Sequence, residues 1–373
     1  MGRRSRIDID TDTSTYRAHL GWAQFGGPDR LCRQTRRPPE RSRLALARAF
    51  VAKAILGFEQ TSQLRSRLAV ETVLVRLLGF ESYRRLPSEA TFSRAFAEFA
   101  EMELPAKAHE ALIRQHLGRT VIGHIARDST AIHARERAQY SAAQTAELNE
   151  AKAAKAGKAD STPKRRGRPP AGAVAADKAK PRSRIPAQLL QTPAQALAEL
   201  PQLCNKGEKR NAQGHFNTCV GYKLHLDVVA CCGVPITAAL TSASVYDNQV
   251  SVPLARLSAQ RVTSLYTLMD AAYDSEPLRQ LERELGHVPI VAINSRGCSH
   301  PPTLDEAQKK RFGERTVVER INSRLKDSFG CASMWVKGHT KVLCHTTFAV
   351  LAVSVDALMR LMLHDKPLQA PPP

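Results

Sequence analysis

The sequence predicts a mixed α/β sheet with helices on its faces, preceded by a helical segment. Two observations support this fold class. Short apolar runs rich in β-branched residues recur from about residue 121 onward, and helical patterns separate the later ones. The predicted order is strand, hairpin, helix, strand, helix, strand and helix, which is typical of a sheet covered by helices.

The N-terminal part of the chain divides in two. Residues 1–40 are polar and contain Gly-Pro and Pro-Pro pairs, so we expect a flexible segment. Residues 41–118 repeat apolar residues at helical spacing. Ser88 is a good N-cap for a helix whose phenylalanines, from Phe92 to Phe99, share one side. The pattern is compatible with a small DNA-binding domain and equally with a plain helical packing unit.

Residues 119–364 are expected to form the sheet and its helices. A first strand through Ile125 would place Asp128 at or just past its end. Residues 219–244 alternate in hydropathy and then run apolar around a glycine turn, which predicts a hairpin. Asp227 lies inside this hairpin and is expected to face solvent.

Strands and helices alternate after the hairpin. A buried strand that starts near residue 264 ends at Asp270, and a helix and a strand over 288–294 follow. One helix, ending at Gly330, precedes a last apolar helix, and residues 365–373 form a disordered tail. Asp247 and Asp274 are each expected to cap the helix that follows them.

Between about residues 138 and 210 the composition changes. This insertion is rich in Lys, Arg, Ala and Pro, so we expect it to be disordered and solvated. Its centre, with Arg166 and Arg168 around a glycine, resembles an AT-hook, in which Arg-Gly-Arg lies along the minor groove. A generic basic linker accounts for the same residues. Both interpretations predict salt-sensitive DNA affinity.

The charge of the chain indicates a polyanionic partner. Its 55 Lys and Arg against 35 Asp and Glu give a formal net charge of +20, and nucleic acid is the commonest such partner. We expect no membrane partner, because no run approaches the roughly 18 apolar residues of a spanning helix. The basic start also lacks the apolar region of a secretory signal, so we expect a cytoplasmic, nucleoid-associated protein.

Other site chemistries are not favoured. The eight cysteines include no CxxC pair, and the spacing of Cys204, His215 and Cys219 fits no zinc pattern. The sequence also has no phosphate-binding loop of the Walker type, so we expect no nucleotide partner.

Three carboxylates are predicted to converge from different elements. Asp128 and Asp270 come from strand ends, and Glu319 comes from a helix. Cleavage of a phosphodiester needs an activated oxygen nucleophile and a stabilised leaving oxygen, which two divalent ions can provide. Mg²⁺ prefers oxygen ligands. The three acids are therefore candidate catalytic and metal-binding residues for two Mg²⁺ ions, with Mn²⁺ as a substitute.

The helix that carries Glu319 has two distinct faces. At about 100° per residue, one narrow polar stripe contains Arg315, Glu319, Asn322 and Lys326. The apolar residues fall on a separate stripe, so the helix buries one face and directs the charged one elsewhere. A surface ladder of i,i+4 ion pairs would produce the same stripe.

Several blocks of the sequence resemble bacterial insertion-sequence transposases with a DDE catalytic domain. The pattern F-x₂-R-x₃-E-x₆-K over residues 312–326 resembles their Y-R-E-K signature, with Phe312 where the family usually has Tyr. ARDSTAIHAR resembles their first-Asp block, GYKLHLDVV and GVPITAALTSASVYDN their hairpin, and LMDAAYDS their second-Asp block. The similarity covers about residues 120–140 and 215–360.

The resemblance implies an RNase H-like fold and an enzyme that cuts insertion-sequence ends and transfers them into target DNA. It assigns the metal-binding acids to Asp128, Asp270 and Glu319. It also implies double-stranded DNA as the partner and a homodimer or higher synaptic complex. The candidate DNA contacts, including those from the insertion and the C-terminal segment, are Arg315, Lys326, Phe312, Arg166, Arg168 and Lys337.

Two other functions are compatible with the same features. A catalytically inactive, transposase-derived DNA-binding protein would keep the fold and the basic surface. A different RNase H-like nuclease, such as a repair or junction-cutting enzyme, would need no specificity for element ends.

Overall fold

The computed structural model of the chain describes residues 40–140, 145–146, 149, 184–210, 216–293 and 303–364. The predicted flexible segment up to residue 39, the predicted tail and the centre of the predicted insertion lie outside the described residues. Arg166 and Arg168 of the AT-hook-like sequence therefore lie outside them as well.

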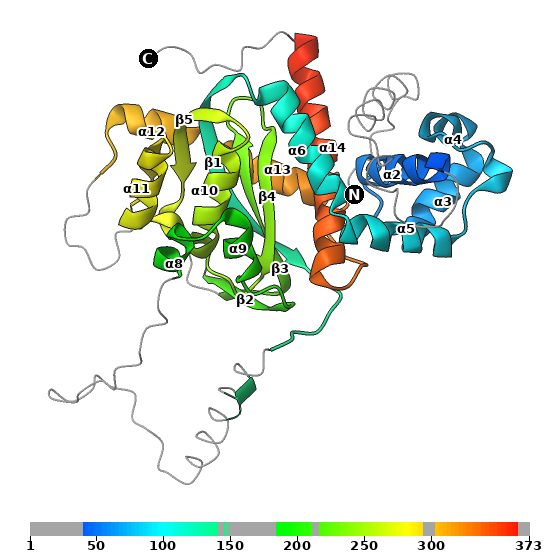
Figure 1. Ribbon diagram of the computed structural model, residues 1–373, viewed down its shortest axis with the longest axis horizontal. Coiled ribbons are helices and arrows are strands. Elements are labelled where there is room, and N and C mark those ends of the chain that lie inside the picture. The colour runs from blue at the N-terminus through cyan, green and yellow to red at the C-terminus, as the bar shows by residue number, and fades with distance from the viewer. Residues whose placement is uncertain are drawn as a thin grey trace, which may run out of the picture.

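A mixed six-stranded sheet forms the centre of the protein (Figure 1). Its strand order is β2-β3-β1-β5-β6, and β4 also pairs with β3. The pairs of β3 with β1, β2 and β4 are antiparallel, whereas β1–β5 and β5–β6 are parallel. The strands are β1 (Val121–His133), β2 (Asn205–Arg210), β3 (Phe216–Val229), β4 (Pro235–Ser242), β5 (Thr263–Met269) and β6 (Val288–Val291).

The predicted hairpin and the predicted strand before Asp270 are both confirmed, as β3–β4 and β5. The first strand is longer than expected, because β1 continues to His133 and Asp128 lies inside it. The reason is that the two neighbouring strands pair with different lengths of β1. Its parallel pairing with β5 ends at Arg127, whereas its antiparallel pairing with β3 continues to His133. Asp128 is thus the first residue of β1 beyond the end of β5.

Helices cover both faces of the sheet (Figure 1). One face carries α10 and α11 with the short helices α8 and α9, and the other carries α13, α14 and α6. The bounds are α6 (Leu104–Leu117), α8 (Ile185–Leu189), α9 (Pro193–Ala198), α10 (Ser251–Ala259), α11 (Glu276–Glu284), α13 (Thr316–Asp327) and α14 (His339–His364). The 3₁₀ turns η2 (Asp247–Val250) and η3 (Ala271–Tyr273) precede α10 and α11.

The C-terminal part of the predicted insertion is folded, contrary to our expectation. It contains α8, α9 and β2, and Ile185, Leu200 and Cys204 are buried. These few apolar residues pack against the sheet and α10, which a composition average over about 138–210 conceals. Only the lysine- and arginine-rich centre keeps the composition that motivated the prediction.

The N-terminal helices pack onto the long C-terminal helix. Ser88 caps α5 through the Thr91 backbone N–H, as predicted. The predicted phenylalanine face is confirmed, because it surrounds Phe50, whose ring lies 5.7 Å from that of Phe348 on α14. One apolar core therefore joins these helices to the sheet. The helices are α2 (Glu40–Ile55), α3 (Thr61–Val70), α4 (Thr72–Leu78), η1 (Tyr83–Arg85) and α5 (Glu89–Glu101).

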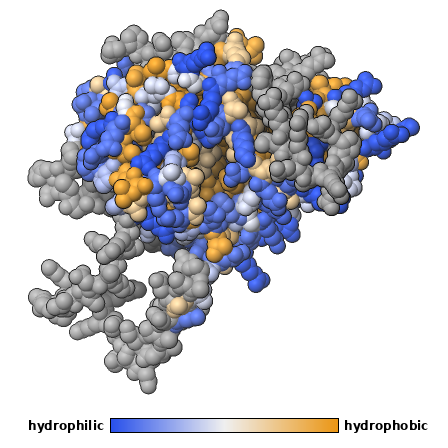
Figure 2. All heavy atoms as spheres, in the orientation of Figure 1, coloured by the Kyte–Doolittle hydropathy of each residue, from blue (hydrophilic) through white to orange (hydrophobic). Residues whose placement is uncertain are grey.

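The last helix corrects one sequence expectation. Within the described residues, α14 is the one helix long and apolar enough to cross a membrane, judged by length and composition alone. However, 83% of its most apolar window is buried inside the protein, against α2, α5, α6 and β4. Its apolar surface is thus used in the core. Figure 2 shows mainly hydrophilic residues over the visible face, with apolar residues in smaller patches.

Candidate active site

Asp128 lies on β1 with its side chain toward α13. Its side chain is 13% exposed. The Nδ2 atom of Asn322, on α13, donates a hydrogen bond of 3.1 Å to Asp128 Oδ2. Asn322 is only 6% exposed, and its Oδ1 has no hydrogen-bond partner among the described residues. The apolar stripe predicted for this helix is confirmed, since its residues pack on the sheet and thereby place Asn322 against the acid.

Asp270 directly follows the end of β5, as predicted. Its Oδ1 accepts a hydrogen bond of 2.9 Å from the Ala272 backbone N–H, which holds the carboxylate at the start of η3. Asp270 lies close enough to Asp128 for the two negative charges to interact. Burial, as the main cause, and the charge of Asp270 raise the pKa of Asp128 to about 6. Ser129, Arg315 and Lys209 act in the opposite direction.

Glu319 is joined to Asp128 through Arg315. The Arg315 guanidinium forms an ion pair with Glu319 and lies 3.9 Å from Asp128 Oδ1. Arg315 is 16% exposed, whereas Glu319 is 52% exposed. The structure therefore brings Asp128, Asp270, Arg315 and Asn322 together, with Glu319 at the solvent side and its carboxylate turned to the arginine.

The donor set fits hard divalent cations. Among the described residues, no three His, Cys, Asp or Glu side chains form a group that could hold a metal ion. However, the acids supply the oxygen ligands that Mg²⁺ prefers. Arg315 places a positive charge between Asp128 and Glu319, and no donor to the buried Asn322 Oδ1 is found among the residues that the structure describes. Both features are expected where a cation would share these groups.

The predicted signature helix is in fact two helices. α12 (Glu306–Gly313) ends before Glu314, and α13 begins at Thr316 and ends at Asp327 rather than at Gly330. Glu314, in the break, lies 3.0 Å from Nδ1 of the buried His124 on β1. This contact holds the α12–α13 junction against β1. Arg315 directly follows Glu314, and its side chain extends toward Asp128 and Glu319. The sequence pattern is continuous across the break, which is why periodicity alone missed it.

The other predicted DNA contacts are spread around this junction. Phe312 lies under Arg315, with the guanidinium 5.7 Å from the ring centroid. Lys326 is half-buried at the far end of α13, and Lys337 is exposed before α14. No ion pair within the described ranges joins either lysine to the three acids.

A cleft of about 970 Å³ opens beside Asp270. Asp247 lines it and corrects another expectation. It is not a helix cap, because Val250 holds the N-cap position of α10 and the Asp247 carboxylate instead pairs with Lys223 at 2.9 Å. Burial would raise the pKa of Asp247, but the charges of Lys223 and His225 and the hydrogen bonds from Lys223 and Ser129 together hold this pKa below its ordinary value.

Asp274 likewise does not cap α11. Ser275 holds the N-cap position of that helix, and the Asp274 carboxylate pairs with Arg279 at 2.6 Å. The prediction rested on Ser275-Glu276-Pro277, which resembles a first helical turn, and it placed the N-cap one residue too early. Arg279, one helical turn later, pairs with the Asp274 side chain instead.

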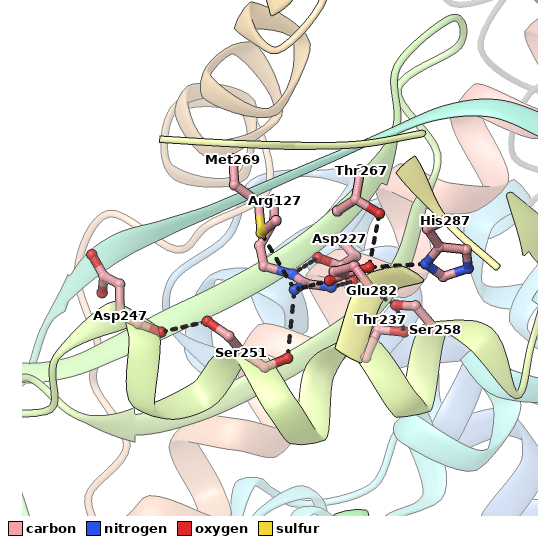
Figure 3. Close-up of polar contacts among 10 residues, drawn as sticks. All are labelled: Arg127, Asp227, Thr237, Asp247, Ser251, Ser258, Thr267, Met269, Glu282 and His287. Atoms are coloured by element: carbon pink, nitrogen blue, oxygen red, sulfur yellow. Dashed lines mark hydrogen bonds and ion pairs between the residues drawn. The ribbon is translucent and has the colours of Figure 1, made fainter. Parts of the chain in front are cut away.

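Arg127 precedes Asp128 on β1, so its side chain points to the other face of the strand. There it belongs to a fully buried polar network (Figure 3). Arg127 donates to both carboxylate oxygens of Asp227, at 2.7 and 2.9 Å, and to Glu282 at 2.8 Å. Thr267 and His287 complete the partners of Glu282. The network thus joins β1, β3, β5 and α11.

This network overturns the prediction that Asp227 faces solvent. Asp227 is 0% exposed, because α10 covers this face of the hairpin and Ser258 of that helix donates to it at 2.6 Å. Burial would raise the pKa of Glu282, but the charges and hydrogen bonds of Arg127 and His287 together hold this pKa below its ordinary value. The alternation of the strand could not show the covering helix, and the pairing of Arg127 with Asp227 becomes visible only in the register of β1 with β3.

Residues 122–354 match the family model for a transposase DDE domain, which is more than half of the chain. The chain belongs to the transposase DDE domain family. A comparison with curated proteins gave no match. Membership in this family implies a transposition enzyme, a DNA substrate and divalent metal ions. The matched region includes Asp128, Asp270 and Glu319 and the buried network behind them, whereas α2–α6 lie before it.

Proposed function

We propose that this transposase-family protein cuts DNA at the ends of an insertion sequence and joins the freed ends to target DNA. The observation that carries the proposal is the connection of Asp128 to Glu319 through Arg315, beside Asp270. Asp128 on a strand and Asp270 after a strand end thus lie near one end of β5, and Glu319 on a helix is linked to Asp128 through Arg315. The family match supports transposition as the reaction class.

The proposed fold type is RNase H-like. It is supported by the strand order β4-β3-β1-β5-β6, in which an antiparallel hairpin is followed by three mutually parallel strands. Asp128 lies on β1, and Asp270 follows the end of β5, the parallel neighbour of β1. Both acids therefore lie where the pairing of these two strands ends. α13 crosses beside them and contributes Glu319.

Asp128, Asp270 and Glu319 would hold two Mg²⁺ ions, or Mn²⁺ in their place. The bound ions supply the positive charge that activates the attacking oxygen and stabilises the leaving one. While no cation is bound, Arg315 orients Glu319 and Asp128. Once a cation binds the two carboxylates, the Arg315 guanidinium would be free to bind a phosphate oxygen. Asn322 holds Asp128 through its amide N–H.

DNA binding would involve a larger surface than the site. Arg315, Phe312 and Lys326 follow one another along the α12–α13 segment, with Lys337 further on. The N-terminal helices and the basic insertion with Arg166 and Arg168 would add contacts that hold the element end. The net charge of +20 favours such binding. Two ends must be held together, so we propose a homodimer or larger complex in the cytoplasm, at the nucleoid.

An inactive, transposase-derived DNA-binding protein is the second candidate. Phe312 favours it, since a phenyl ring cannot donate the hydrogen bond of the tyrosine usual in the family signature. The presence of all three acids and of Arg315 favours the active enzyme.

The proposal is tested with a labelled duplex that carries the terminal sequence of the protein's own element. In Mg²⁺, wild type should nick it at the element boundary and Asp270→Ala should not. Asp327→Ala is the matched control, because Asp327 is an exposed acid at the end of α13. Nicking by Asp270→Ala at the wild-type rate would contradict the assignment. Nicking of unrelated branched DNA at an equal rate would indicate a different nuclease.

A further inference from the structure

The cleft beside Asp270 is lined by residues of different chemistry. Lys209 of β2, Thr130 of β1, and Tyr246 and Asn248, between β4 and α10, all line it. Its volume, about 970 Å³, is at the upper end of the roughly 300–1,000 Å³ of ligand sites. The cleft is thus large enough for a substantial part of a polymeric substrate, and it begins at one of the proposed metal-binding acids.

Among the described residues that line this cleft, Lys209 is the lysine available to a ligand. Lys223, which also lines the cleft, donates to Asp247 at 2.9 Å and to the Val245 carbonyl at 2.7 Å. Lys206, on the same strand as Lys209, pairs with Glu208 at 2.7 Å. Lys209 is exposed, and no ion pair is found for it in the part of the chain that the structure describes.

Lys209 also lines the same cleft as the candidate site. Asp270 and Ser129, the residue after Asp128 on β1, both line this cleft. A phosphate placed on Lys209 would therefore lie beside the acids rather than at a remote surface. It would also meet a positive charge where Asp128, Asp270 and Asp247 would otherwise repel it.

Tyr246 provides an aromatic surface in the same cleft. It is 70% exposed although it lines the cleft. Stacking of a base on an aromatic ring is sequence-tolerant, and it requires a base that is not paired within a duplex. An ammonium and an exposed ring that line one cleft match the backbone and the base of one DNA strand.

We propose that this cleft binds an unpaired stretch of DNA next to the cut, with a phosphate on Lys209 and a base on Tyr246. This inference rests on the proposed function, because it gives the DNA substrate its path beside the acids. It adds a binding site outside the signature residues Phe312, Arg315, Glu319 and Lys326.

The first test measures the salt dependence of binding to an element-end duplex with a single-stranded overhang. Fluorescence anisotropy in Ca²⁺ would compare Lys209→Gln with Lys206→Gln, which removes a neighbouring charge on the same strand. Lys209→Gln should lower the slope of log affinity against log salt by about 0.7, the value for one single-strand phosphate contact. Lys206→Gln should change it less. Equal slopes for the two variants would overturn the role of Lys209.

The second test places 2-aminopurine in the overhang and uses Tyr246→Ala and Tyr246→Phe. Tyr246→Ala should weaken overhang binding at least 5-fold and remove the stacking quench of the probe, and Tyr246→Phe should restore both. Binding of a fully paired duplex should not change. Wild-type binding and quench in Tyr246→Ala would overturn the role of Tyr246.

Failure of this inference is distinguishable from failure of the proposed function. A wild-type protein that binds the overhang through Lys209 and Tyr246 but never cuts DNA would contradict only the cleavage. A wild-type protein that cuts at the element end while both variants bind and cut like it would contradict only the cleft.

Discussion

The amide of Asn322 donates a hydrogen bond of 3.1 Å to Asp128 and so joins α13 to β1 at the candidate active site. The contact fixes a carboxylate whose side chain is only 13% exposed. The same amide leaves its buried oxygen without a partner among the described residues. A buried polar atom without a partner lowers the stability of the fold. A role of Asn322 in positioning Asp128 would explain why the protein tolerates this cost.

Removal of this hydrogen bond should weaken metal binding. We expect Asn322→Leu to lower the affinity for Ca²⁺ or Mn²⁺ by about 10- to 100-fold, as for other residues that orient a metal ligand. Calorimetric titration of the protein without DNA measures this affinity. Ser323→Ala, at the next and exposed position of α13, is the control. An unchanged affinity in Asn322→Leu would show that Asp128 does not depend on it.

Arg315 should affect metal binding and DNA cleavage in opposite directions. Its guanidinium competes with a cation for Asp128 and Glu319. Arg315→Gln should therefore bind Mn²⁺ several-fold more tightly in the absence of DNA, and yet cut DNA more slowly because a phosphate contact is lost. Arg320→Gln removes the same charge from an exposed position of α13 and should change neither quantity strongly. A parallel loss of both in Arg315→Gln would contradict the competition.

Metal binding should depend on pH through Asp128. The pKa of its carboxyl is raised from 3.8 to about 6, with burial as the main cause. Protons and cations compete for it, so Ca²⁺ affinity should be nearly constant above pH 7 and fall about tenfold per unit below pH 6. The carboxyl also binds its proton more tightly in the folded protein than in the unfolded chain. It therefore contributes stability to the metal-free protein at low pH, and this stability is lost as the pH rises through about 6. Titrations from pH 5 to 8 that gave a constant affinity would refute this.

The buried network behind Asp128 should dominate local stability. Arg127→Met leaves Asp227 and Glu282 buried without their cation, and we expect a loss of about 3–5 kcal/mol in the free energy of unfolding. Urea denaturation measures it. Arg283→Met, which breaks an exposed ion pair with Glu276, should cost less than about 1 kcal/mol. Similar costs for the two variants would show that the network is not a structural anchor.

Much of this arrangement was predictable from local patterns. β5 and the hairpin follow from apolar runs and a glycine turn, and the position of Asp270 follows from the end of β5. The two stripes of α13 follow from helical spacing, because Val318 and Ile321 bury one face whereas Glu319 lies on another.

Other features depend on contacts that no local pattern contains. Asp128 lies inside β1 because β3 extends its pairing beyond β5. Asp227 is buried because α10 covers the hairpin and Arg127 lies opposite in the neighbouring strand. Asp247 pairs with Lys223, which is 24 residues away in sequence. In each case a tertiary partner decided the outcome over a single-residue preference.

The most direct test of the central claim is cleavage of the element-end duplex in Mg²⁺ by wild type and by Glu319→Gln. Glu319 is half exposed and removed from the core, so the amide should leave folding intact. We predict boundary cleavage by wild type and a loss of at least 100-fold in Glu319→Gln, with DNA binding retained. Cleavage by both proteins at similar rates, or by neither despite tight salt-dependent binding, would contradict the assignment of Glu319 to a working DDE site.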